Sequence, residues 1–174
     1  MSDRLDGQSS HPGRGPEPAP RPPPRPIDDV DRRLLFELGR DARLSVRALA
    51  ERVGTSRSNA YARLDRLVGE GVIRGFGVRL DPDAAGLGTS AYVMVQIEQN
   101  SWRQVAGRLR RIPYVEHLAL VAGDVDVLVL VRAPDNTALR HVVLEEIQGI
   151  PTVRSTRTWL VFDEVAGPGP WPAG

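Results

Sequence analysis

The spacing of apolar residues changes part-way along the chain, and this change restricts the folds that the chain can adopt. Between residues 28 and 69, apolar side chains recur every three or four positions, which predicts amphipathic helices. Between residues 89 and 162, stretches with helical spacing alternate with stretches in which every second residue is apolar, as in half-buried strands. The sequence therefore predicts a helical module followed by an α+β domain.

The helical module is expected to contain three helices. A residue type that favours the N-cap position precedes each of them: Asp28, Ser45, and either Thr55 or Ser56. Gly54 is expected to end the second helix, because a tight turn with positive φ favours glycine. The third helix is expected to end at Gly69 or Gly71, and residues 71–80 to form a short strand that leaves the module.

The second part of the chain contains four expected strands and two expected helices. The strands cover residues 89–98, 114–122, 125–131 and 152–162, and the helices cover residues 102–111 and 135–148. This βαββαβ order predicts an antiparallel sheet with both helices on one face. Because the strands are apolar or mixed on both faces, we expect a second subunit to cover the face without helices.

Both ends of the chain differ in composition from these domains. Residues 1–26 are rich in proline, glycine, serine and arginine, so we expect a disordered or polyproline-like arm. Three roles stay open for it: a passive tail, a contact to DNA phosphates, or a PxxP ligand. Residues 166–174 are expected to form a second disordered end, which leaves domains at 27–88 and 89–165.

Composition excludes several classes of protein. The chain has no cysteine, and hence no disulfide and no cysteine-ligated metal. No apolar run reaches the roughly 18 residues of a membrane span, and the N-terminus lacks the apolar core of a signal peptide. We therefore expect a cytoplasmic protein with no membrane partner.

Charge is divided unevenly between the two parts. Residues 28–80 hold eleven arginines against eight acidic residues, a balance of +3, whereas residues 81–174 hold eight arginines against eleven acidic residues, a balance of −3. This asymmetry predicts a polyanionic partner for the first part only.

A short turn between two amphipathic helices, at about residues 46–65, is typical of a helix-turn-helix motif. The second helix of such a motif lies in the major groove of double-stranded DNA and reads bases near its N-terminus. The side chains expected to touch DNA are Arg47, Ser56, Arg57, Ser58, Asn59, Tyr61 and Arg63. Arg57 suits guanine and Asn59 suits adenine, while the serines and Arg47 suit phosphates.

Two other interpretations of this segment stay open. Arg63 and Arg66 either point toward the DNA backbone or pack across the module. The polar side chains are also compatible with a solvated helix face, and trihelical modules serve as protein interaction domains as well.

Six segments together resemble the Lrp/AsnC family of bacterial and archaeal regulators, also called feast/famine regulatory proteins. They are residues 27–35, 39–50, 56–67 and 71–73, the turn Gly123-Asp124-Val125-Asp126, and the final strand at 156–161. The resemblance covers residues 27–165, and it depends on the order and spacing of the segments rather than on any one motif.

The resemblance implies a winged helix-turn-helix joined by a strand to a ferredoxin-like ligand-sensing domain. It also implies a homodimer, often assembled further into an octamer, and an amino acid or related metabolite as effector between dimers. Carried over by position, the effector site comprises Gly123, Asp124 and Asp126, with Thr156 nearby. Glycine lets backbone approach a ligand, and a carboxylate can hold an α-ammonium group.

The same turn also has a purely structural interpretation, because Gly123 and Asp124 suit an ordinary hairpin. Two residues depart from the family pattern close to it. Val125 replaces the usual aromatic residue, and Thr152 replaces the usual glycine after Pro151.

No catalytic residue, metal site or cofactor is expected. The three histidines, His11, His117 and His141, lack ligand spacing, and no complete phosphate-binding glycine loop is present. Sirohaem decarboxylases are similar to this family, but residues 114–120 hold one histidine where those enzymes carry histidine-rich segments. That enzyme, an architectural DNA-binding protein and an oligomerising scaffold are the alternatives to a sequence-specific regulator.

Overall fold

The computed structural model describes residues 25–165 and 167. The chain forms two compact units, the first ending at Phe76 and the second beginning at Gly77. The arm expected to be disordered, with His11, lies outside the described residues except for its last two positions. The expected disordered C-terminal end also lies outside them, apart from Gly167.

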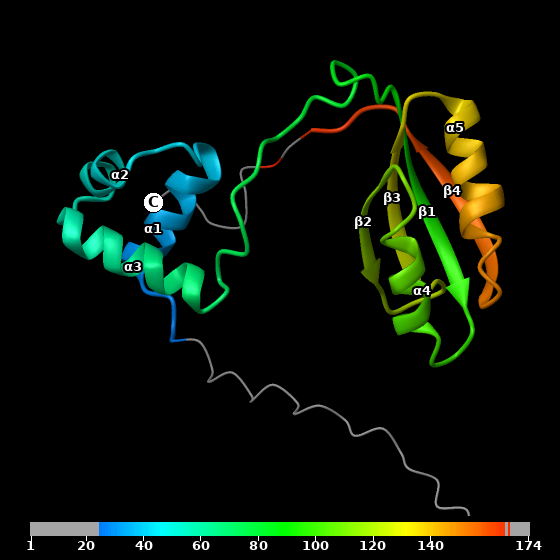
Figure 1. The fold of residues 1–174 in the computed structure, drawn as a ribbon, viewed down its shortest axis with the longest axis horizontal. Helices are drawn as coiled ribbons and strands as arrows, with labels where there is room; N and C mark the ends of the chain where they lie inside the picture. Colours follow the sequence, from blue (N-terminus) through cyan, green and yellow to red (C-terminus); the bar gives the residue numbers. More distant parts are fainter. Residues whose placement is uncertain (1–24, 166, 168–174) are drawn as a thin grey trace, which may run out of the picture. The chain divides into compact units, whose positions relative to one another are not determined.

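The first unit contains the three expected helices, α1 (Asp29–Arg40), α2 (Val46–Val53) and α3 (Arg57–Gly69) (Figure 1). Each begins at a cap whose side chain accepts a backbone hydrogen bond: Asp28 from Asp31, Ser45 from Ala48, and Ser56 from Asn59. Gly54 ends α2 in the left-handed conformation with φ of 70°. The turn between α2 and α3 is therefore determined by local sequence.

Apolar residues from all three helices form the core of this unit. Its buried members are Leu34, Leu38, Leu49, Ala50, Val53 and Ala60. Because α3 contributes to this core, one face of α3 is fixed and its polar face is left outward.

The prediction of a strand over residues 71–80 is wrong. The structure assigns no strand there, and the residues from Arg74 to Leu80 are exposed. A strand needs a partner for its backbone hydrogen bonds. Among the described residues, the sheet contains only the four strands of the second unit. Alternating apolar residues alone therefore did not produce a strand here.

The second unit has the predicted βαββαβ order. Its elements are β1 (Thr89–Ile97), α4 (Trp102–Leu109), β2 (Val115–Leu120), β3 (Val127–Ala133), α5 (Asn136–His141), η1 (Val142–Ile147) and β4 (Val153–Val161). The strands form one antiparallel sheet in the order β2-β3-β1-β4 (Figure 1). One buried cluster joins inward residues of β1 and β3 to residues of α4, α5 and η1, so the helices cover the same face.

The helix predicted over 135–148 is continuous but not uniform. Asp135 caps α5 as expected, and η1 then continues it as a π-helix in which the Gln148 amide donates to the Val143 carbonyl over 3.1 Å. The wider turn places Val142 and Val143 side by side in the core, where both are buried. Gly149 comes soon after, and a Cβ at that position would overlap the carbonyl oxygen of Glu145.

The sheet face opposite the helices carries a row of large side chains, most of them apolar. Pairing places His117 opposite Leu130, Leu130 opposite Tyr92, and Tyr92 opposite Trp159, so the row crosses all four strands. We call this row with its neighbours Met94, Leu128 and Arg157 the open face. Trp159 is 63% exposed at its edge.

Candidate nucleic-acid interface and ligand site

The first two turns of α3 present the polar side chains predicted to meet DNA. Ser56, Arg57, Ser58, Asn59 and Tyr61 are all exposed. The Arg57 side chain makes no hydrogen bond or ion pair within the part of the chain that the structure describes. Its guanidinium is therefore available for a bidentate contact to a base edge.

Arg47 lies in the first turn of α2 and is exposed as predicted. Its Nε donates to Oε1 of Glu51 over 3.0 Å, one turn along the same helix. An exposed ion pair of this kind is weak, so a phosphate can compete with Glu51 for Arg47.

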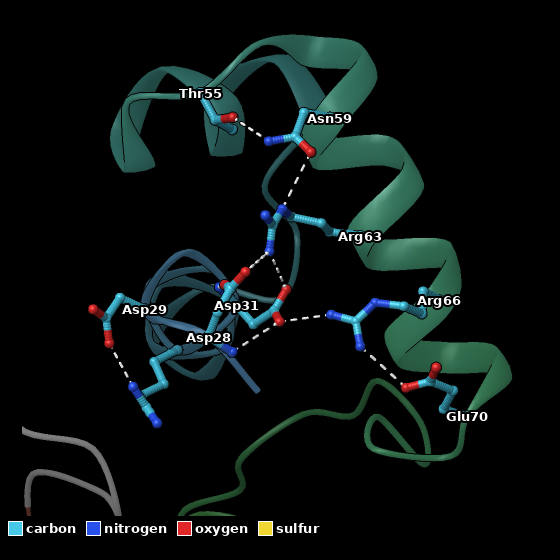
Figure 2. A network of polar contacts seen from close by, with 9 residues as sticks. Asp28, Asp29, Asp31, Thr55, Asn59, Arg63, Arg66 and Glu70 are labelled. Carbon is cyan, nitrogen blue, oxygen red and sulfur yellow. Dashed lines mark hydrogen bonds and ion pairs between the residues drawn. The ribbon is translucent and has the colours of Figure 1, made fainter. Parts of the chain in front are cut away.

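Arg63 differs from the other predicted residues, because its side chain packs across the module. Its Nη1 donates to Asp28 Oδ2 over 2.6 Å and to Asp31 Oδ1 over 2.9 Å (Figure 2). Arg66 does the same from the next turn, with Nη2 at 2.6 Å from Asp31 Oδ2. The sequence left open whether Arg63 and Arg66 point toward the DNA backbone or pack across the module. In the structure both pack across the module.

Asp31 is the centre of this network; its spacing of three residues from Asp28 matches the Asp-x-x-Asp start of the family pattern, but does not predict its contacts with α3. It is only 1% exposed, yet both of its oxygens accept from arginines. Its Oδ2 also accepts from the Asp28 amide over 3.1 Å, which completes a capping box at the start of α1. The carboxylate therefore fixes the first turn of α1 and ties α1 to α3.

The network continues to the exposed end of α3 through Asn59. The Arg63 Nε donates to Asn59 Oδ1 over 3.2 Å, and Asn59 Nδ2 donates to Thr55 Oγ1 over 2.7 Å (Figure 2). The spacing of four residues between Thr55, Asn59 and Arg63 is the signal in the sequence that could have revealed this contact.

The arginines also change the acidity of the two carboxyl groups. The hydrogen bond from Arg63, with a second from the Asp31 amide, lowers the pKa of Asp28 to about 2. Burial acts to raise the pKa of Asp31, but the hydrogen bonds from Arg63, the Asp28 amide and Arg66 outweigh it, so this pKa also lies below its usual value. Both groups therefore favour their charged forms in the folded unit.

These shifts predict an acid-sensitive first unit. A carboxyl group whose pKa is lower in the folded than in the unfolded chain stabilises the fold above its unfolded pKa. For Asp28, this stabilisation is expected to be lost as pH falls from its ordinary value of 3.8 toward 2. Urea titrations followed by NMR signals of α1–α3 should show the midpoint falling over this range. An Asp28→Asn variant should show a weaker dependence on pH, and equal dependence would contradict the assignment.

The predicted effector residues lie around the connection between β2 and β3. Gly123 has φ of 146°, a region that side chains rarely adopt. Asp126 ties the connection to the end of β1, because its Oδ2 accepts from the Ile97 amide over 2.8 Å. Asp124 is exposed, and its backbone oxygen accepts from Gln96 Nε2 over 2.8 Å. Its carboxylate faces solvent.

Gln96, Ser155 and Gln148 contact the predicted effector residues directly or through one another, and sequence reasoning missed all three. Gln96 joins the connection to β4, because its Oε1 accepts from Ser155 Oγ over 2.7 Å. Thr156, the fourth predicted residue, lies next to Ser155 on β4 and accepts from Gln148 Nε2 over 2.7 Å. Gln96 lies 28 residues from Asp124 and 59 residues from Ser155 in the sequence, so no local spacing reveals these contacts.

Three other features of the described residues concern metal binding, membrane spans and cavities. They include no group of three or more His, Cys, Asp or Glu side chains that could hold a metal ion. None of their helices is both long enough and apolar enough to cross a membrane. A cavity of about 550 Å³ in the second unit lies away from the predicted effector residues, between residues 80–90, Arg132 and residues 161–165.

Comparison with known proteins now identifies both units. Residues 27–74 match the winged helix-turn-helix DNA-binding family, and residues 90–170 match the Lrp/AsnC ligand binding domain. The chain is 38% identical over 149 residues to the HTH-type transcriptional regulator AldR of Mycolicibacterium smegmatis, covering 84% of this chain and 87% of AldR.

The chain belongs to the Lrp/AsnC family. It is a transcriptional regulator of this type, with a helix-turn-helix DNA-binding domain, as the resemblance implied. Solved Lrp/AsnC-type structures agree with the fold. A feast or famine regulatory protein from M. tuberculosis, complexed with L-methionine, is 34% identical with a TM-score of 0.73, covering 82% of this chain and 96% of that one. A transcriptional regulator from Neisseria meningitidis, also complexed with L-methionine, is 27% identical with a TM-score of 0.76, covering 84% and 97%.

Proposed function

We propose that this Lrp/AsnC regulator recognises a specific DNA sequence through the first two turns of α3. Arg57 is exposed and its guanidinium has no partner among the described residues, and Asn59, two residues further along α3, is exposed as well; these two observations carry the proposal. These two groups suit guanine and adenine in the major groove. Arg47, Ser56, Ser58 and Tyr61 are proposed to hold phosphates or sugars around them, and a regulator of this kind acts on DNA in the cytoplasm.

Fluorescence anisotropy tests this function directly. The protein is titrated onto the DNA upstream of its own gene and onto a scrambled duplex, across a series of salt concentrations. Tighter binding to the native fragment, with a salt slope that reports several released counterions, supports a specific regulator. Equal, salt-sensitive binding to both duplexes would favour the architectural alternative, and no binding at low salt would overturn DNA recognition altogether.

Two arginines should separate base recognition from phosphate contact. Arg57→Ala is expected to weaken binding to the preferred duplex by about 10-fold and to relax base preference at one position. Arg47→Ala is expected to weaken binding to all duplexes alike and to reduce the salt slope by about one. Titrations on matched and single-mismatch duplexes measure both effects. Identical profiles for the two variants would contradict this division of roles.

We further propose that an amino acid is the effector. The two solved structures complexed with L-methionine support this choice, and so does the solvent-facing carboxylate of Asp124, which can hold an α-ammonium group. Gly123, Asp126 and Thr156 are proposed to shape the site. Isothermal titration with the L-amino acids should find a ligand that Asp124→Asn binds at least about 10-fold more weakly. Asp163→Asn, a second exposed carboxylate of this unit, is the control, and equal losses would contradict the site.

The assembly is proposed to be a homodimer through the open face, which associates further into a larger homo-oligomer such as an octamer. A ligand bound between dimers would then change DNA occupancy, and the size of this change is limited by the difference in the ligand's affinity for the two assemblies. Light scattering and anisotropy with and without the ligand measure both effects together.

A further inference from the structure

The amide of Asn59 is oriented by its neighbours before any DNA is present. The Arg63 Nε contacts one end of the amide and Thr55 Oγ1 contacts the other (Figure 2). An arginine Nε only donates hydrogen bonds, so the amide atom that faces it must be the oxygen. The amide nitrogen then faces Thr55, whose hydroxyl oxygen can accept from it.

Arg63 is itself fixed from its far end. Its Nη1 lies within hydrogen-bonding distance of both Asp28 and Asp31. Because the guanidinium is planar and rigid, holding Nη1 also sets the direction of the Nε–H bond. Orientation is therefore transmitted from the buried carboxylate of Asp31 on α1 to an exposed amide on α3.

The contacts leave part of the amide free. An asparagine amide offers two N–H donors and two lone pairs on its oxygen, and Arg63 and Thr55 use one of each. Within the described part of the chain, one donor and one acceptor remain on an exposed side chain. Adenine presents the complementary pair in the major groove, an acceptor at N7 and a donor at N6.

We propose that Arg63 is a positioning residue for base recognition, which orients the Asn59 amide so that α3 prefers an A·T pair at one position of its site. The inference rests on the proposed function, because α3 must lie in the major groove. It gives Arg63 a role through Asn59 instead of a phosphate contact of its own. Thr55 supports the same orientation from the other side.

The test uses the full chain and single-base-pair variants of a duplex selected from a random pool. Asn59→Ala identifies the base pair that Asn59 reads, at which the wild-type protein should prefer A·T by about 10-fold or more. Arg63→Lys keeps a cation opposite Asp28 and Asp31 but lacks the separate Nε–H group that donates to Asn59. It should reduce the preference at that pair to about threefold or less, with unchanged preferences elsewhere and an unchanged salt slope.

Arg66→Lys is the matched control, because it alters the other ion pair of Asp31 without a contact to Asn59. It should keep the full A·T preference. If Arg63→Lys keeps that preference too, or weakens binding to all duplexes alike, the inference is overturned.

Thr55→Val provides a second test that leaves the arginine network intact. Loss of the hydroxyl frees the amide nitrogen and should lower the same A·T preference by about threefold. An unchanged preference in this variant would count against the inference even if Arg63→Lys failed to fold. A wild-type protein with no preference at any base pair would overturn the proposed function and the inference with it.

Discussion

Replacing Asp31 with alanine is expected to lower the free energy of unfolding of the first unit by about 3 kcal/mol. The substitution removes the shared partner of two guanidiniums, those of Arg63 and Arg66, and it opens the capping box of α1. Removing the buried carboxylate leaves each guanidinium with a single acidic partner, Asp28 for Arg63 and Glu70 for Arg66. The loss should fall at the low end of its usual range, because both arginine side chains reach solvent. Urea titrations followed by NMR signals of α1–α3 measure it.

Asp29 supplies the matched control for Asp31 on the same helix. Its side chain is 88% exposed and pairs with Arg32, one turn away. Exposed pairs contribute little, so Asp29→Ala should cost no more than about 1 kcal/mol. If the two alanine variants lose the same stability, the buried network does not hold α1 to α3 in the way the contacts indicate.

Trp159→Ala is expected to weaken the proposed dimer by about 30-fold or more. A large aromatic side chain that a partner buries commonly contributes this much. Trp159 lies in the row across the open face, directly opposite Tyr92, and its exposed indole is the largest apolar group that a partner could cover there. Sedimentation velocity over a dilution series measures the change in the dimer dissociation constant.

Leu160 is the control on the same strand. It is half-exposed, but it pairs with Ala91 and so faces the helix side of the sheet. Leu160→Ala should therefore leave the dissociation constant nearly unchanged. A stronger effect from Leu160 than from Trp159 would place the interface on the other face of the sheet.

The parts of the fold that depend on neighbouring residues were predictable from the sequence. Asp28, Ser45 and Ser56 cap helices because each side chain reaches an amide three residues ahead. Gly54 ends α2 because its conformation suits glycine. The alternation of β1 and β3 likewise predicted which side chains share a face of each strand, since the period of two is a local property.

The remaining features depend on residues far apart in the chain. The sequence placed Arg63 on α3, but its link to Asp31 spans 32 residues, and no local pattern predicts a buried carboxylate. The expected strand at 71–80 failed because pairing requires a partner that spacing alone does not supply. Gln96 and Ser155 meet only because β1 and β4 are neighbours in the folded sheet.

The π-helical segment η1 affects how the α5–η1 helix tolerates the insertion or deletion of a single residue. In an ordinary α-helix, loss of one codon rotates every later side chain by about 100° and displaces the next strand. In η1 the backbone already carries a turn closed over five residues instead of four. Removal of one exposed residue, such as Leu144, should let the turn close as an α-helix while Ile147 and β4 keep their places. We expect related genes to differ by single-codon insertions and deletions here more readily than elsewhere in the helices.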